Sequence, residues 1–312
     1  MRRILFTVLG VVASFGLSAQ DINFGHGFSE SSIHHKAAIE FKNKVEEQTD
    51  GQVQVHVFHS GQLGSAREMF EGLQLGSLEM TWVPTARISG FAPQLQYFDL
   101  PFVFEDYDEL EQEIDGQLGE RLLATLEEQG VKGLGFYIDG FKYITTDKPI
   151  KTIDDFKGLK FRTMESDIVM QFYRALGADP VPIDYAEVYS ALQMGAIDGQ
   201  ENPAILIQDM KFYEVQDNLT KSDHAVLAGV LLANQAWFDE LDPEVQEILA
   251  IESQNLLKNQ RALAREEENK AVQALLEHGL ELYELDDSEK AKMKEKTQFI
   301  VDGFIEKYNL SD

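Results

Sequence analysis

The stretch YAEVYSALQMGAIDGQENP, residues 185–203, decides the fold of this chain. Asp184 can cap a helix that begins here, and Glu187, three residues later, completes a capping-box pattern. Apolar residues then recur at the spacing of one helical face. Gly195 can take the left-handed conformation that ends a helix. The first half of the stretch therefore predicts a short amphipathic helix and its end.

The second half predicts a strand followed by a polar loop. We expect the strand to start at Ala196 and Ile197, and the next residues to present amides and a carboxylate on a turn. The residues of this turn are Gly199, Gln200, Glu201, Asn202 and Pro203. A loop at the carboxyl end of a strand is where α/β folds bind their ligands.

A second segment has the same plan. EGLQLGSLEMTWV (residues 71–83) and SALQMGAIDGQEN (residues 190–202) each combine a helix end, LQ-x-G, a small residue, a strand and a loop. A predicted strand precedes each of them, at residues 52–58 and 159–164. Two such α/β units facing each other would place both loops on one cleft. The alternative is coincidence, because LQ-x-G is a common way to end a helix.

The rest of the pattern favours an α/β fold. Strands alternate with helices along the chain, which predicts a mainly parallel sheet. Asp242 and Pro243 cap and start a long helix, whose apolar stripe continues to about Glu277. At 1.5 Å per residue this helix is roughly 50 Å long, so we expect it to straddle both units.

The first nineteen residues differ in composition from the rest of the chain. Arg2 and Arg3 precede an apolar run of secretory length, and small residues near Ala19 suit a cleavage site. This pattern predicts a signal peptide cleaved near Ala19; the alternative, an uncleaved anchor, suits so short a run poorly. The 312 residues include no cysteine, so the exported chain forms no disulfides.

The chain is strongly acidic. Its formal net charge is −27, and removal of the two leader arginines makes it more negative by two units. The negative electrostatic field of such a chain disfavours nucleic acids and anionic membranes as partners. Any anionic ligand therefore needs a local cationic pocket. The simplest reading of the acidity itself is a solvated surface suited to salty surroundings.

Motifs of the common enzyme classes are absent from the sequence. There is no G-x-S-x-G elbow, P-loop or H-E-x-x-H, and thiol catalysis is excluded. The seven histidines are scattered, so we expect neither a metal nor a cofactor. Arg162 is the sharper candidate, because a buried guanidinium can bind a carboxylate through two parallel hydrogen bonds. From spacing alone, a structural ion pair is equally compatible.

Several segments together resemble one family. Residues 185–203, with DDFKGLKFRTMES, ALGADPVP, KFYEVQ, HKAAIEF, SGQLG, GSLEM and DLPFVF, are similar to solute-binding proteins of tripartite ATP-independent periplasmic (TRAP) transporters. The similarity covers essentially the whole mature chain. It implies an extracytoplasmic binding protein with an α/β, two-lobed, type II-like fold, a central ligand cleft, a hinge and a long helix across both lobes.

The resemblance assigns roles to individual residues. It implies that Arg162 pairs with the ligand carboxylate, that Asn202 supports the ligand and that Tyr185 packs over it. Lys142 stands where several relatives have a second arginine, which keeps the charge but loses the guanidinium fork. Arg87 matches an arginine used by relatives specific for sialic acid, but those relatives have an acid where this chain has Pro84 and an asparagine where it has Gly27, which argues against that ligand. The expected ligand-binding residues are Arg162, Asn202, Lys142, Tyr185, Trp82, Phe28 and Arg87.

These expectations define a function without a catalytic step. The protein would carry a small carboxylate-bearing solute, such as a uronate or another hydroxy or keto acid, to the small and large membrane subunits of a TRAP transporter. Lobe I would comprise residues 20–139 and 228–267, and lobe II residues 140–227 and 268–312. A monomer is the default. The alternatives are a binding protein of an ABC transporter and a periplasmic enzyme on the same fold.

Overall fold

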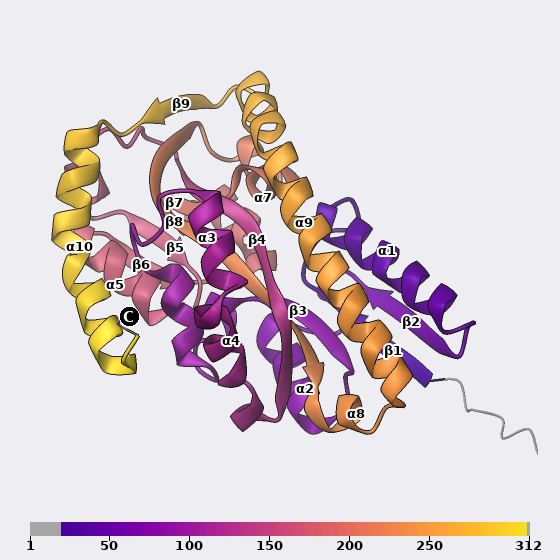
Figure 1. Ribbon diagram of the computed structural model, residues 1–312. Helices are drawn as coiled ribbons and strands as arrows, with labels where there is room; N and C mark the ends of the chain where they lie inside the picture. Colours follow the sequence, from indigo (N-terminus) through magenta and orange to yellow (C-terminus); the bar gives the residue numbers. More distant parts are fainter. Residues whose placement is uncertain (1–19, 311–312) are drawn as a thin grey trace, which may run out of the picture.

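The computed structural model describes residues 20–310, so the predicted signal peptide lies outside the described residues. Within that range, nine strands form one sheet in the order β2-β1-β3-β8-β4-β7-β5-β6, and β9 pairs with β8 (Figure 1). The strands are β1 (Gln20–Gly25), β2 (Val53–Phe58), β3 (Met80–Pro84), β4 (Val131–Thr146), β5 (Lys160–Thr163), β6 (Asp179–Pro182), β7 (Gly199–Asn202), β8 (Asn218–Asn234) and β9 (Glu281–Glu284).

Helices cover the sheet and fill its connections. The α-helices are α1 (Ile33–Gln48), α2 (Ala66–Leu75), α3 (Tyr107–Ile114), α4 (Gln117–Ala124), α5 (Asp167–Leu176), α6 (Val188–Gln193), α7 (Ala204–Asp209), α8 (Gln235–Asp239), α9 (Pro243–Glu277) and α10 (Asp287–Tyr308). Short 3-10 helices are η1 (Thr85–Ile88), η2 (Pro93–Asp99), η3 (Glu127–Gln129), η4 (Ile153–Phe156), η5 (Tyr185–Glu187) and η6 (Phe212–Glu214). None of the helices in residues 20–310 is long and apolar enough to span a bilayer.

The sheet is mixed, so the expectation of a mainly parallel sheet was wrong at its centre. β2, β1 and β3 are parallel to one another, as are β6, β5 and β7. Between these two groups, β4 and β8 pair antiparallel with each other and with β7 and β3 respectively. The reason is that β4 carries the chain from one group to the other and β8 carries it back.

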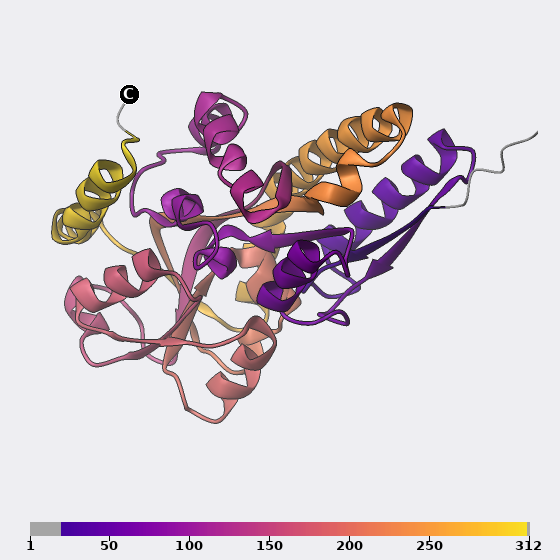
Figure 2. The ribbon, with the colours of Figure 1, turned by 90° about the horizontal axis from the view of Figure 1, so that it is seen from below.

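The long helix α9 extends along both groups. It begins at Pro243, where the side chain of Asp242 accepts a hydrogen bond from the Glu244 amide, and it ends at Glu277 as predicted. It packs against α1 and β4 and also against α7. Figures 1 and 2 both show α1 and α9 side by side, with α10 far from them. One helix thus contacts segments that belong to different halves of the sheet.

The antiparallel pairing of β4 with β8 is interrupted where the strands pass between the two groups. Phe141 pairs with Val226, and the next pair in the ladder joins Tyr143 to Lys221, so the intervening β8 residues bulge out. Gly140 has a φ of +127°, and a Cβ atom there would lie 2.7 Å from a tyrosine hydroxyl. Both features require glycine at this position.

The expected loop around Glu201 is in fact the buried strand β7. This strand pairs antiparallel with β4, from Thr146 opposite Gly199 to Tyr143 opposite Asn202. The expected strand start at Ala196 was therefore three residues too early. Because side chains alternate across a strand, Asn202 and Glu201 point to opposite faces of the sheet. That alternation separates the two residues functionally.

Candidate ligand-binding site

A pocket lies where the carboxyl ends of the two parallel strand groups meet. Residues that follow β1, β2 and β3 line one side, and residues that follow β5 and β6, with the end of β7, line the other. Its polar and aromatic lining residues are Phe28, Ser60, Ser65, Trp82, Arg87, Arg162, Asp184, Tyr185 and Asn202. The space between its walls, out to the open mouth, is about 670 Å³. A cleft lined by aromatic and apolar side chains with a few polar groups is typical of a small-molecule site.

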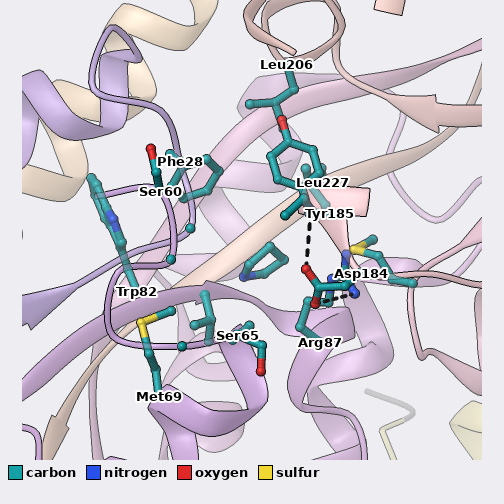
Figure 3. A pocket seen from close by; sticks show the side chains of 18 of the residues that line it. Phe28, Ser60, Ser65, Met69, Trp82, Arg87, Asp184, Tyr185, Leu206 and Leu227 are labelled. Atoms are coloured by element: carbon teal, nitrogen blue, oxygen red, sulfur yellow. Dashed lines mark hydrogen bonds and ion pairs between the residues drawn. The ribbon is translucent and has the colours of Figure 1, made fainter. Parts of the chain in front are cut away.

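Aromatic side chains form two facing walls. Figure 3 shows Phe28 and Trp82 on one side and Tyr185 on the other, with Leu206 beside Tyr185. Trp82 and Phe28 are buried, and their rings meet edge to face with centroids 6.3 Å apart. The indole Nε1 of Trp82 and the hydroxyl of Tyr185 are buried and have no hydrogen-bond partner within residues 20–310. Each wall therefore includes a residue whose buried polar atom is unsatisfied.

Arg162, on β5, is the dominant charge of the pocket. Its side chain is 1% exposed, and its Nε donates to the Ile183 carbonyl over 3.1 Å. Its Nη2 is buried and has no hydrogen-bond partner in the part of the chain that the structure describes. Burial, and next the positive charge of Arg87, lower the pKa of Arg162 to about 9. The guanidinium still carries its charge at neutral pH, and no carboxylate of residues 20–310 forms an ion pair with it.

Arg87, on η1, approaches the same backbone carbonyl from the other side of the cleft. Its Nη2 donates to the Ile183 oxygen over 3.4 Å, and its Nη1 lies 3.6 Å from a carboxylate oxygen of Asp184 (Figure 3). Burial lowers the pKa of Arg87, and the charge of Asp184 opposes that effect. The two arginines thus differ: Arg87 has a carboxylate close by, and Arg162 has none.

Asn202 is held by a chain of buried polar side chains. Its Nδ2 donates to Gln200 Oε1 over 2.5 Å, and Gln200 Nε2 donates to Thr145 Oγ1 over 2.9 Å. Thr145 in turn donates to Gln216 over 3.1 Å, and Gln216 donates to Asp147 over 2.8 Å. This chain fixes the rotamer of Asn202 at the pocket wall, which is the arrangement expected of a preorganised binding residue.

Lys142 does not line the pocket. Its Nζ donates to Glu201 Oε1 over 2.8 Å, and both side chains are buried. The other carboxylate oxygen of Glu201 accepts from the Tyr173 hydroxyl over 2.5 Å and lies 2.8 Å from His224 Nε2. Burial acts to raise the pKa of Glu201, but Lys142 and His224 outweigh it and hold the pKa well below its usual range. Glu201 thus lies in a buried polar network and is not among the residues that line the pocket.

A second carboxyl group borders this buried network. Asp99 lies 4.0 Å from Lys142 Nζ and accepts a hydrogen bond of 2.8 Å from the Ser166 hydroxyl. Burial raises the pKa of Asp99 to about 6, although Lys142 acts in the opposite direction. The network joins η2, β4, β7 and the β8 bulge, so it ties together the segments that pass between the two strand groups.

Histidine side chains lie next to the aromatic wall formed by Phe28 and Trp82. His26 is fully buried, its ring lies edge-on to Trp82 with centroids 6.2 Å apart, and its Nε2 lies 3.2 Å from His35 Nδ1. Burial, followed by repulsion from His34, His35 and His59, lowers the pKa of His26 to about 3. No group of three or more potential ligands in residues 20–310 is arranged to hold a metal ion.

The depressed pKa of His26 predicts acid-sensitive stability. Below its ordinary pKa of 6.5, the unfolded chain binds a proton that the folded chain does not, so folding loses up to about 1.4 kcal/mol per pH unit between 6.5 and 3. We expect His26→Gln to unfold with a shallower pH dependence in urea titrations between pH 7 and 4. The same substitution at exposed His278 is the control. An unchanged slope in His26→Gln would contradict the assignment.

The structure brings six of the seven expected residues to one pocket and leaves Lys142 outside it. It also adds residues that the sequence did not single out for binding: Ser60, Ser65, Met69, Met164, Asp184, Leu206 and Leu227. Most of them follow the end of a parallel strand, and that position is the signal that could have found them. Asp184 was expected only as a helix cap, which it also is, because it accepts from the Ala186 amide over 3.3 Å.

A pocket formed between two groups of parallel strands that are joined by two long crossing strands defines an α/β solute-binding protein of the two-lobed type. The comparison with known families gives the particular group. Residues 24–307 match the family of bacterial extracellular solute-binding proteins, family 7. The chain belongs to this family.

Similar proteins with described ligands support the same assignment. The chain is 34% identical to the 2,3-diketo-L-gulonate-binding periplasmic protein YiaO of Escherichia coli K12, over 88% of this chain and 84% of that protein. It is also 34% identical to the C4-dicarboxylate-binding periplasmic protein DctP of Rhodobacter capsulatus, over 98% and 95% respectively. Both relatives are transport binding proteins.

The fold matches a solved complex. The sugar acid binding protein DctPAm of Advenella mimigardefordensis, crystallised with galactonate, superposes with a TM-score of 0.90 at 34% identity, covering 93% of this chain and 94% of that one. The expectations of a TRAP-type solute-binding protein and of an α/β two-lobed fold are therefore confirmed.

Proposed function

We propose that this protein captures a small organic acid in the pocket by pairing its carboxylate with Arg162, and delivers it to the small and large membrane subunits of a TRAP transporter. The observation that carries the proposal is the buried Nη2 of Arg162, which has no partner. A buried guanidinium without an anion is costly, and a ligand carboxylate removes that cost. The ligand classes we favour are sugar acids, such as uronates, and other hydroxy or keto acids.

The proposed lobes correspond to the two strand groups. Lobe I comprises residues 20–139 and 228–267, and lobe II residues 140–227 and 268–312. The bulge in β8 and the positive φ of Gly140 lie where the chain crosses between them, as expected of a hinge. A ligand that contacts both Arg162 and Arg87 would touch both lobes and favour the closed state.

The ligand class can be tested directly. Purified mature protein is screened by thermal unfolding against uronates, aldonates, keto acids and dicarboxylates, and the hits are measured by calorimetry. A ligand at 1,000 times its dissociation constant adds about 4 kcal/mol of stability, which raises the melting temperature by several degrees. If no organic acid stabilises the protein and a neutral solute does, the proposal is wrong.

Two hydrogen bonds of Asp209 outside the pocket, which we call the latch, predict a separate effect on affinity. Asp209 accepts hydrogen bonds from Ser29 over 2.6 Å and from Ser31 over 3.2 Å, which join the end of α7 to the loop after β1. Under the lobe assignment above, both bonds form only when the cleft is closed. We expect Asp209→Ala to weaken ligand binding about 5- to 30-fold in calorimetry, because it disfavours closure by roughly 1–2 kcal/mol.

The neighbouring exposed residue Gln208 provides the control for this latch. Gln208→Ala leaves both serine contacts in place and should bind the ligand as the wild type does. Equal affinities of the Asp209→Ala variant and the wild type would show that the latch does not contribute to closure.

A further inference from the structure

The charges of the pocket limit the kind of acid it can take. Among its lining residues, which all lie in the described part of the chain, the charged side chains are Arg87, Arg162 and Asp184. Their formal charges sum to one positive charge. Lys142, expected as a second cation of the pocket, is instead paired with Glu201 over 2.8 Å. One anionic group therefore neutralises the pocket, and a second would be left without a free cation.

The polar atoms without partners indicate what else the ligand carries. Arg162, Trp82 and Tyr185 all line the pocket, and each has a buried polar atom without a hydrogen-bond partner among residues 20–310: Nη2, Nε1 and the hydroxyl respectively. An indole N–H only donates hydrogen bonds, and a phenol both donates and accepts. The three residues come from both walls, so a ligand with oxygen atoms along its length complements them better than one with a carboxylate alone.

We propose that this pocket is specific for monocarboxylates that carry several hydroxyl or carbonyl oxygens, and that Asp184 determines this specificity by neutralising Arg87. The inference rests on the proposed function and narrows it. Asp184 lies 3.6 Å from Arg87 Nη1 and its side chain is 44% exposed at the pocket wall. A carboxylate in that position can accept a hydrogen bond from a ligand hydroxyl and repels a second ligand carboxylate.

Asp184→Asn is the variant that isolates this charge. Asparagine has the same shape and is an equally good cap, so the hydrogen bond from the Ala186 amide is retained. The change raises the charge of the pocket from one positive unit to two. Glu187→Gln is the matched control, because it removes the same charge from an exposed residue of the same short helix that does not line the pocket.

The experiment is calorimetric titration of the wild type and both variants with D-galactonate and D-galacturonate as monocarboxylates and with succinate and malate as dicarboxylates. We expect the wild type to bind at least one monocarboxylate at least tenfold more tightly than either dicarboxylate. In Asp184→Asn, the ratio of the two affinities should move at least tenfold toward the dicarboxylates. Glu187→Gln should keep the wild-type ratio.

The outcomes distinguish a failure of the specificity assignment from a failure of the proposed function. If the wild type prefers a dicarboxylate, or if Asp184→Asn changes both classes equally, the specificity assignment fails. The proposed function survives that outcome as long as Arg162→Ala abolishes the binding observed. If no acid of either class binds at millimolar concentration, both proposals fail together.

Discussion

Replacing Arg162 by alanine is expected to weaken binding of the cognate acid by at least about a hundredfold. The substitution leaves a ligand carboxylate in a buried site without its guanidinium, and removing one partner of a buried ion pair costs about 3–5 kcal/mol. At 1.4 kcal/mol for each factor of ten, this corresponds to roughly 100- to 4,000-fold in the dissociation constant. Calorimetry on the wild type and the variant measures it.

Two further variants make this result specific. Arg174→Ala removes an exposed arginine of α5 and should leave affinity unchanged. Arg162→Lys keeps the charge but loses the two-pronged geometry, so we expect an intermediate affinity. The ligand-free Arg162→Ala protein should remain folded, because the substitution removes a buried charge whose Nη2 has no partner. Wild-type affinity in Arg162→Ala would disprove the role of this residue.

The second large effect is on stability. Glu201→Gln is expected to lower the free energy of unfolding by about 3 kcal/mol, because it removes the nearer of the two carboxylates beside the buried ammonium of Lys142 and leaves only Asp99, 4.0 Å away. The melting temperature should fall by roughly 10 °C, as measured by thermal unfolding at pH 7 without ligand. The ligand pocket is not lined by Glu201, so the change should act on folding first and on binding only through it.

A double-mutant cycle tests whether the loss comes from the ion pair. Lys142→Met removes the stranded charge, so the double variant with Glu201→Gln should be more stable than Glu201→Gln alone. If the double variant instead loses as much stability as the two single variants lose together, Glu201 and Lys142 do not stabilise the fold as a pair.

The sequence was sufficient for the overall plan, because its strongest signals are local. The long helix was predicted at its true bounds, since Asp242 and Pro243 mark its start and its apolar stripe continues to Glu277. The resemblance to the family pointed to Arg162 and Asn202, and the structure places both residues at the pocket. The antiparallel centre of the sheet was missed because local patterns do not show which strand pairs with which.

The failures around the site have a common physical cause. Glu201 and Asn202 are adjacent in sequence, and a turn would have placed both at the ligand; a strand sends them to opposite faces. The position of the Lys142 side chain likewise depends on its hydrogen bond to Glu201, which lies fifty-nine positions away along the chain. The pairing of Asp184 with Arg87 joins residues from different strand groups. Contacts of this kind become visible only when the tertiary structure is known.

The Ile183 carbonyl accepts hydrogen bonds from both Arg162 and Arg87. A backbone acceptor is present whatever side chain occupies position 183. Substitutions around it can therefore change the size and charge of the pocket without releasing the two guanidiniums. For protein engineering, this makes the arginine pair a constant part of the closed pocket, and position 184 the natural place to redirect the protein toward a different class of acid.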